Sequence, residues 1–215
     1  MFYGLADSAG IYLDKTLDDL FNHKRDGFYI ELGANNGLAQ SNTAFFEFSR
    51  GWRGVLIEPS KGAFQQCVIN RPNSSVHNYV CVSNDYESAT ITGDFNGSLM
   101  SSVGGLRLSS HSLLECPATT ITSILDRAVP EGQNIDFLSL DTEGYELNVL
   151  KGLNFDKWRP HYLLIEIYNT DYEALLTYLR EHGYDILCNF SNYNKSTNPG
   201  WDGTHNDFLF IDTRR

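Results

Sequence analysis

Phe28-Tyr-Ile-Glu-Leu-Gly-Ala-Asn-Asn-Gly37 is the stretch that decides the fold class of this chain of 215 residues. Its first half, 28–32, is a short apolar run, which predicts a buried strand. Gly33 and Gly37 predict a tight turn, because glycine reaches backbone angles that other residues resist. A helix is expected next, from Ser41 to Arg50. A strand, a glycine turn and a helix in this order are typical of an α/β sheet that binds its ligand at the carboxyl ends of the strands.

The same alternation continues outward through the chain. We expect strands at 28–32, 55–58, 76–82, 135–140, 162–167, 184–190 and 207–211 and helices at 10–23, 41–50, 61–70, 123–128, 145–151 and 172–182. This order predicts a doubly wound, Rossmann-like, mostly parallel sheet with helices on both faces. Only a polar loop joins the last two strands, which predicts seven strands of which one is antiparallel. Residues 83–117, rich in Gly and Ser, are expected to hold short strands and loops.

Size and charge narrow the classes of function. The length favours a single domain over residues 1–215, although the abrupt start leaves open a piece of a larger glycan-building enzyme. The formal net charge of −11 disfavours nucleic acid and polyanionic membranes as partners. No apolar run approaches the roughly 20 residues that span a bilayer, and no signal peptide is visible. The four cysteines form no metal or redox motif, so we expect a cytoplasmic protein.

The first turn favours one class of nucleotide ligand over another. Gly33 and Gly37 are spaced G-x-x-x-G, whereas dinucleotide sites use G-x-G-x-x-G to make room for a pyrophosphate. Glu58 ends the next strand, where a carboxylate can accept hydrogen bonds from both hydroxyls of a ribose. Together these residues favour an adenosyl ligand without pyrophosphate over a tight turn with no ligand.

Several longer stretches carry motifs. They are Gly27-Phe-Tyr-Ile-Glu-Leu-Gly-Ala-Asn-Asn-Gly, Ser41-Asn-Thr, Gly51-Trp52, Val55-Leu-Ile-Glu-Pro59, Asp136-Phe-Leu-Ser-Leu-Asp-Thr-Glu-Gly-Tyr-Glu-Leu-Asn-Val-Leu-Lys-Gly and Asn206-Asp-Phe-Leu-Phe. In these stretches, from about Tyr12 to Ile211, the chain resembles the FkbM family of methyltransferases. The Asp-x-Glu-Gly-x-Glu segment that begins at Asp141 is the most specific part. The resemblance implies the class I methyltransferase fold, S-adenosylmethionine as cofactor, and O-methylation of sugars or glycosylated products, for example of a deoxyhexose such as rhamnose.

The resemblance also implies a set of cofactor-binding residues. The glycine turn would wrap the cofactor, Glu58 would hold its ribose, and the residues after the third strand would lie near adenine. The set is Glu31, Gly33, Ala34, Asn35, Gly37, Ser41, Glu58, Pro59, Ser83, Asn84 and Asp141.

Methylation of an alcohol needs a base or a metal ion to remove its proton. Asp141 ends the fourth strand, and Glu166 and Asn169 end its expected neighbour. Oxygen ligands from adjacent strand ends suit Mg²⁺ or Mn²⁺, so these three residues are candidate metal ligands. The alternative is that Asp141 only accepts a hydrogen bond from the cofactor's amino group and that Glu143 only caps a helix.

His205 is the candidate general base, and the predicted catalytic set is Asp141, Glu166 and His205. If the last strand is antiparallel, His205 and Asn206 lie at the same edge as the carboxyl ends of the other strands. The alternative is a histidine on a surface loop. His111, in the Gly/Ser-rich region, is a weaker candidate.

The polar loop 191–204 carries Tyr193 and Trp201 among amides and hydroxyls, which suits a sugar with apolar faces and a hydroxylated rim. The alternative is a solvated loop whose rings pack into the core. The predicted acceptor-binding residues are Glu143, Tyr168, Asn169, Tyr193, Trp201 and Asn206.

Two other functions compete with methyl transfer. An NAD-dependent sugar oxidoreductase or epimerase would need G-x-G-x-x-G and usually Tyr-x-x-x-Lys, and neither occurs in the sequence. The second alternative is a degenerate, non-catalytic module that binds cofactor or glycan. The intact glycine turn, Glu58 and Asp141 argue against such a loss of catalytic residues but leave this alternative open.

Overall fold

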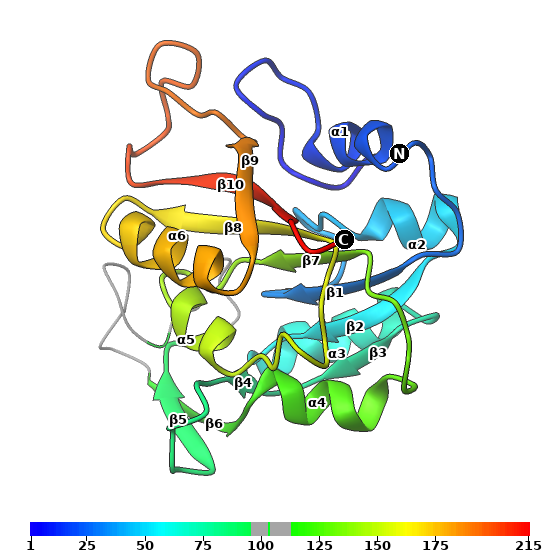
Figure 1. The fold of residues 1–215 in the computed structure, drawn as a ribbon, viewed down its shortest axis with the longest axis vertical. Coiled ribbons are helices and arrows are strands. Elements are labelled where there is room, and N and C mark those ends of the chain that lie inside the picture. Colours follow the sequence, from blue (N-terminus) through cyan, green and yellow to red (C-terminus); the bar gives the residue numbers. More distant parts are fainter. Residues whose placement is uncertain (96–102, 104–112) are drawn as a thin grey trace.

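The computed structural model describes residues 1–95, 103 and 113–215, and its centre is a seven-stranded sheet (Figure 1). The strand order is β3-β2-β1-β7-β8-β10-β9, and β10 runs antiparallel to both of its neighbours. This confirms the predicted fold class, a mostly parallel sheet with one reversed strand. The strands are β1 (Phe28–Leu32), β2 (Arg53–Ile57), β3 (Ser75–His77), β7 (Phe137–Leu140), β8 (Tyr162–Tyr168), β9 (Tyr184–Asn189) and β10 (His205–Asp212).

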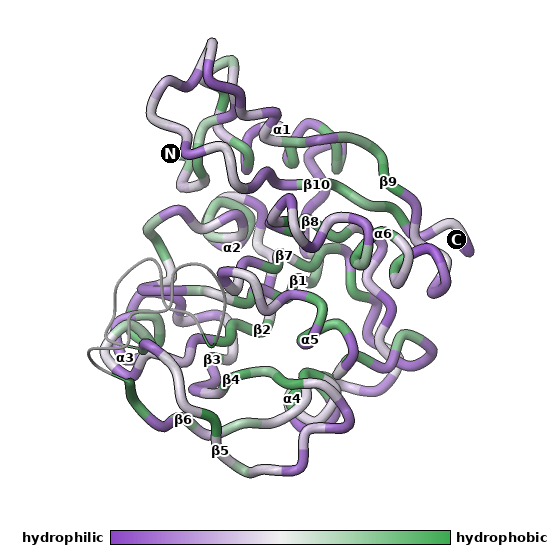
Figure 2. The backbone as a smooth tube through the Cα atoms, turned by 90° about the vertical axis from the view of Figure 1, so that its left-hand side faces the viewer, coloured by the Kyte–Doolittle hydropathy of each residue, from purple (hydrophilic) through white to green (hydrophobic). Residues whose placement is uncertain are grey.

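Helices cover both faces of this sheet, because side chains alternate between the faces along each strand. Ile30 and Leu32 pack with α4 (Ile121–Ala128), α5 (Glu146–Lys151) and α6 (Tyr172–Glu181). Tyr29, between them, packs on the other face with α1 (Leu13–Leu20), α2 (Ala44–Arg50) and α3 (Lys61–Asn70). Figure 2 shows apolar strand segments inside a more polar periphery.

A second, three-stranded sheet lies beside the first. It consists of β4 (Val80–Cys81), β6 (Leu114–Thr119) and β5 (Thr90–Gly93). The prediction of one strand over 76–82 is therefore wrong: β3 belongs to the main sheet and β4 to the small one. The Asn78 side-chain amide donates to the carbonyls of Glu58 and Pro59 at 2.8 Å, and this contact fixes the turn between the two strands.

Two predicted helices are shorter than expected. The first ends at Leu20 instead of at His23, because Asn22 and His23 have left-handed backbones with φ of 51° and 55°. The second begins at Ala44 instead of at Ser41, whose hydroxyl accepts a hydrogen bond from the Ala44 N–H at 3.0 Å. Among the described helices, none has the length and apolar character to cross a membrane.

Candidate active site

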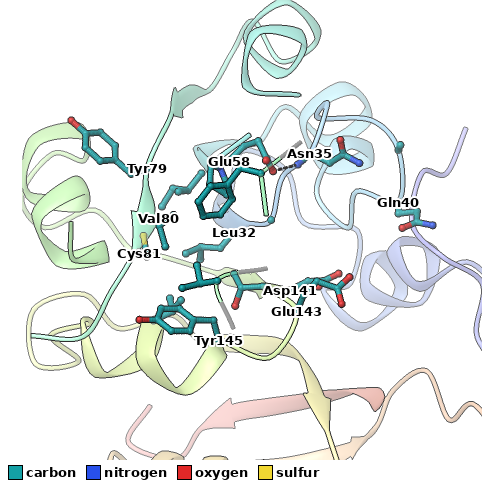
Figure 3. A pocket seen from close by; sticks show the side chains of 18 residues that line it. Leu32, Asn35, Gln40, Glu58, Tyr79, Val80, Cys81, Asp141, Glu143 and Tyr145 are labelled. Carbon is teal, nitrogen blue, oxygen red and sulfur yellow. Dashed lines mark hydrogen bonds between the residues drawn. The ribbon is translucent and has the colours of Figure 1, made fainter. Parts of the chain in front are cut away.

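A cleft opens at the carboxyl ends of β1, β2 and β7 (Figure 3). Its polar side includes Gly33, Asn35, Gln40, Glu58, Pro59, Asp141, Thr142 and Glu143. Its apolar side includes Leu32, Ile57, Tyr79, Val80, Cys81, Phe95, Tyr145 and Val149. One side can therefore hold a flat apolar ring while the other accepts hydrogen bonds.

Gly33 holds the three strand ends together. Its N–H donates to the Ile57 carbonyl at 3.1 Å, and a Cβ atom at this position would lie 1.9 Å from the carbonyl oxygen of Asp141. Its φ of +77° also lies in the region that favours glycine. A glycine is therefore needed here for the turn and for the close approach of β7.

Glu58 presents a nearly buried carboxylate to the cleft. Its oxygens accept hydrogen bonds from the backbone N–H groups of Asn35, at 2.8 Å, and Ser60, at 2.7 Å. Burial raises the pKa of Glu58 to about 7, and these two bonds oppose that rise. Glu58 acts electrostatically on two thiols, Cys67 and Cys116, whose pKa burial raises to about 12 and about 11. Each carboxylate oxygen keeps a lone pair for a further donor from a ligand.

Glu31 lies behind the turn and not in the cleft. It shares the sheet face of Tyr29, and its carboxylate accepts hydrogen bonds from the hydroxyls of Ser41, at 3.0 Å, and Thr43, at 2.6 Å, and from the Asn42 N–H. Both Glu31 and Ser41 were expected to contact the cofactor. Their place in the structure is instead to shape the loop that follows the turn.

Arg71 fixes the same loop from α3, and sequence reasoning missed it. Its side chain is fully buried and donates to the Gly37 carbonyl at 2.9 Å, to the Thr43 hydroxyl at 2.8 Å and to the Glu47 carboxylate at 2.9 Å. Each of these partners is at least 24 positions away in sequence, so no local pattern indicates the network.

Four further predicted cofactor residues do not line the cleft. Ala34 is buried in the core, and Gly37 packs against Arg71. Ser83 donates to Asp85, and Asn84 is exposed. Because the predicted third strand is split, the residues that reach the cleft from this segment are instead Tyr79, Val80 and Cys81.

Three carboxylates gather beside the polar side of the cleft. Ligand oxygens of Asp141, Glu143 and Glu166 lie within 4.8 Å of one another. Asp141 as a whole residue is exposed and lines the cleft, whereas its carboxylate is desolvated by the neighbouring groups. Burial and the neighbouring charges of Glu143, Asp207 and Glu146 raise its pKa well above the ordinary value. Burial, followed by the charge of Asp141, does the same for the pKa of Glu166.

Glu143 is a member of this group and not a helix cap. Its backbone has a φ of 56°, unusual for a residue other than glycine, and the Tyr168 hydroxyl donates to its carboxylate at 2.5 Å. The acid in the first turn of α5 is Glu146, which accepts hydrogen bonds from the N–H groups of Thr142 and Gly144. The alternative of a capping Glu143 is therefore wrong.

His205 begins β10 at the expected edge, opposite Tyr168 of β8. Its Nε2 lies 3.2 Å from a carboxylate oxygen of Glu166. The Thr204 hydroxyl donates to Asp202 at 2.6 Å, so its oxygen accepts the Nδ1–H of His205 at 2.9 Å. In the neutral ring this arrangement leaves the lone pair on Nε2, which accepts a hydrogen bond from Glu166 when that carboxyl group is protonated, as its raised pKa favours. His111 falls outside the described residues.

The remaining predicted acceptor residues hold the loop 191–204 in place. The Asn206 amide oxygen accepts from the Ser191 hydroxyl and the Tyr193 N–H, and the Asn169 amide donates to the Gly203 carbonyl. The indole N–H of Trp201 donates to the His205 carbonyl at 2.9 Å. Asn169 thus faces the loop. Glu143, and not Asn169 as predicted, lies with Asp141 and Glu166 in the carboxylate group.

The model of the methyltransferase FkbM domain matches residues 31–186 of this chain. The chain belongs to the FkbM methyltransferase family. Methyl transfer is therefore the reaction class, and the alternative of an NAD-dependent sugar oxidoreductase is set aside. No curated protein matches this FkbM methyltransferase.

Solved methyltransferase structures are similar to this FkbM methyltransferase at low sequence identity. TrmK of M. capricolum, in complex with S-adenosyl-homocysteine, is 10% identical with a TM-score of 0.51, over 93% of this chain and 68% of that one. An S-adenosylmethionine-dependent methyltransferase from Geobacter sulfurreducens is 10% identical with a TM-score of 0.48, over 93% and 90%. One from Thiobacillus denitrificans is 11% identical with a TM-score of 0.48, also over 93% and 90%.

Proposed function

We propose that this FkbM methyltransferase transfers the methyl group of S-adenosylmethionine to a hydroxyl group of a sugar, for example a deoxyhexose such as rhamnose in a glycan. The observation that carries the proposal is the two-sided cleft: a nucleoside fits between Glu58 and the apolar wall, and beside its polar side lie three carboxylates and His205.

The residues of the cleft fit an adenosyl cofactor. Glu58 accepts hydrogen bonds from both ribose hydroxyls, while Val80, Phe95 and Tyr145 offer apolar contacts to adenine. Gly33 lets the backbone approach the ligand, and Asp141 accepts a hydrogen bond from an ammonium group. M. capricolum TrmK, of the same fold, was solved with S-adenosyl-homocysteine, which supports this choice.

Bound S-adenosylmethionine supplies a methyl group on a sulfonium, so the bond from oxygen to carbon forms as the bond from carbon to sulfur breaks and its electron pair stays on sulfur. His205 Nε2 takes the proton of the acceptor hydroxyl. The Glu166 carboxylate, 3.2 Å away, stabilises the imidazolium that results. A divalent ion at the carboxylates would assist by lowering the pKa of the hydroxyl.

The acceptor sugar lies between the carboxylates and the loop 191–204. Tyr193 and Trp201, which are partly exposed, offer rings for the apolar face of a sugar. Tyr168 and Asn206 are buried, and together with Asn169 they position Glu143 and the loop around the acceptor. The N-terminal segment forms the outer wall, since the Ser8 N–H donates to the Ser191 carbonyl at 3.0 Å and the two segments lie side by side (Figure 1).

The state of the cysteines bears on the cellular compartment. All four cysteines are free thiols, which supports a reducing, cytoplasmic compartment. We further propose that residues 1–215 act as a single methyltransferase domain.

Calorimetry followed by a transfer assay tests the proposed function. We expect S-adenosylmethionine and S-adenosyl-homocysteine to bind one per chain, and NAD to show no heat of binding. Labelled S-adenosylmethionine should then give an O-methyl sugar with rhamnose-bearing glycans, identified by mass spectrometry. Uptake of NAD in place of the adenosyl cofactor contradicts the assignment. Cofactor binding without transfer to any glycan favours a non-catalytic module.

Glu58 predicts a pH dependence for cofactor binding. Its folded-state pKa, about 7, lies above its ordinary value of 4.5, so ionising Glu58 destabilises the cofactor-free protein as pH rises through that window. Ribose hydroxyls favour the ionised form, so binding releases a proton near pH 7. We expect the association constant to be about tenfold lower at pH 6 than at pH 8.

The measurement is titration calorimetry in buffers that differ in ionisation enthalpy, which counts the released protons. The control is Glu58→Gln, which should bind the cofactor more weakly and release about one proton fewer on binding than the wild type does. Equal affinities of the wild type at both pH values would show that Glu58 does not bind the ribose in its ionised form.

A further inference from the structure

Two groups of side chains in the described part of the chain have the composition of a metal site, and they differ in how their charge is balanced. One is Asp18, Asp19 and His23, and the other is Asp141, Glu143 and Glu166. In the first group, the Arg50 guanidinium donates to the Asp18 carboxylate at 2.7 and 2.6 Å. That carboxylate is therefore already neutralised within the fold.

In the second group, one carboxylate oxygen of Glu166 lacks a hydrogen-bond donor among the described residues. The residue is only 8% exposed. Its Oε1 lies 3.2 Å from His205, whereas its Oε2 is buried and has no hydrogen-bond partner among the described residues. Without a bound ion, a proton shared with Asp141 is the one means that the described residues offer to satisfy this pair of carboxyl groups, and a cation would take the place of that proton.

The spacing of the group is close to that required by a single hard cation, although it can exceed the Mg²⁺ limit by up to about 0.6 Å. Oxygen ligands lie 2.0–2.1 Å from Mg²⁺ and 2.3–2.6 Å from Ca²⁺, so two oxygens on one ion are at most roughly 4.2 to 5.2 Å apart. The ligand oxygens of Asp141, Glu143 and Glu166 lie within 4.8 Å of one another. Small side-chain movements therefore bring all three onto one ion.

The surroundings add negative charge and little positive charge. Asp207 and Glu146 add their negative charges to those of Asp141 and Glu166. Neither Asp141 nor Glu166 forms an ion pair with a lysine or arginine within the described ranges. The Tyr168 hydroxyl donates to Glu143 and orients it toward the group, as outer partners of metal ligands do.

We propose that Asp141, Glu143 and Glu166 bind one divalent cation of the Mg²⁺ or Mn²⁺ class next to the acceptor hydroxyl. Glu143 replaces Asn169 in the ligand set predicted from the sequence, because the Asn169 amide is held by the Gly203 carbonyl. The inference rests on the proposed function for the purpose of the ion, which is to polarise the acceptor oxygen. Binding of the ion itself requires neither cofactor nor acceptor.

The experiment measures Mn²⁺ binding to the whole chain after treatment with EDTA and dialysis. Free Mn²⁺ is followed by electron paramagnetic resonance, and Mg²⁺ competes in a second titration. We expect one Mn²⁺ per chain, displaced by Mg²⁺, and at least a tenfold weaker affinity in each of Asp141→Asn, Glu143→Gln and Glu166→Gln. Circular dichroism of each variant checks that the fold is kept.

Asp19→Asn is the matched control, because Asp19 belongs to the other group and is exposed. It should bind Mn²⁺ as the wild type does. The proposal is overturned if the wild type binds no Mn²⁺ at millimolar concentration, if the three variants bind it normally, or if Asp19→Asn alone removes binding.

The test also separates this inference from the proposed function. Methyl transfer that persists in EDTA, with no Mn²⁺ bound, overturns the cation site and leaves the O-methyltransferase intact. Specific Mn²⁺ binding without transfer to any hydroxyl supports the cation site and overturns the proposed acceptor chemistry.

Discussion

Gly33→Ala is expected to lower the free energy of unfolding by more than about 3 kcal/mol, because overpacking and a strained backbone act together. The new Cβ would lie 1.9 Å from the Asp141 carbonyl oxygen, which belongs to rigid backbone and cannot move aside. The φ of +77° adds strain for any side chain. Either β7 separates from β1 or the turn changes shape, and the cofactor cleft is lost in both cases. Urea unfolding followed by circular dichroism measures the change.

Gly62→Ala is the control for this variant. Gly62 lies inside α3, and a Cβ there meets nothing within 4 Å. Alanine is the better helix former, so this variant should be more stable than the wild type by up to about 1 kcal/mol. A Gly33→Ala protein with the stability of the wild type would contradict the geometry described for the turn.

His205→Ala is expected to lower kcat by about 10²- to 10⁴-fold, the usual contribution of a positioned base. This corresponds to roughly 3–5 kcal/mol of activation free energy. His205 contacts Glu166, Thr204 and Trp201 and does not line the cofactor cleft, so the Kd for S-adenosylmethionine should be unchanged. Single-turnover transfer with saturating cofactor measures the effect, and added imidazole should restore part of the rate.

His77→Gln serves as the comparison, because His77 lies on β3 and its ring contacts Ser75. Its kcat should equal that of the wild type. Full turnover by His205→Ala would favour the alternative of a loop histidine. A loss that imidazole does not restore, together with a changed fold, would point to a structural role for the contact with Glu166.

Local patterns predicted the parts of the site that depend on a single strand and its turn. Gly33, Asn35, Glu58 and Asp141 line the cleft as expected, because each directly follows a strand whose carboxyl end faces the ligand edge. Glu31 was predicted to contact the cofactor but lies behind the turn. The period-2 alternation of a strand already puts Glu31 on the face of Tyr29, opposite to that of Leu32.

Residues that depend on distant partners could not be predicted in the same way. The division of 76–82 into β3 and β4 requires the pairing of Val80 with Ala118 in the small sheet, which no local pattern encodes. The local sequence around Arg71 indicates only that a helix ends there. The role of Arg71 in fixing the loop depends on the Gly37 carbonyl, which is far away in the sequence. The short distance between Glu143 and Glu166 likewise depends on strand order. Glu143 follows β7, Glu166 belongs to β8, and these two strands are neighbours in the sheet.

The reversed direction of β10 has a consequence for how this enzyme can diversify. β9 ends and β10 begins at the edge of the sheet where the ligand is expected. The connection between these two strands therefore lies at the β8–β10 side of the proposed site. Its length and composition can vary without altering the register of the five strands on the other side. Exchanging this hairpin is therefore a route to a changed preference for the proposed acceptor, while the residues that line the proposed cofactor cleft keep their places.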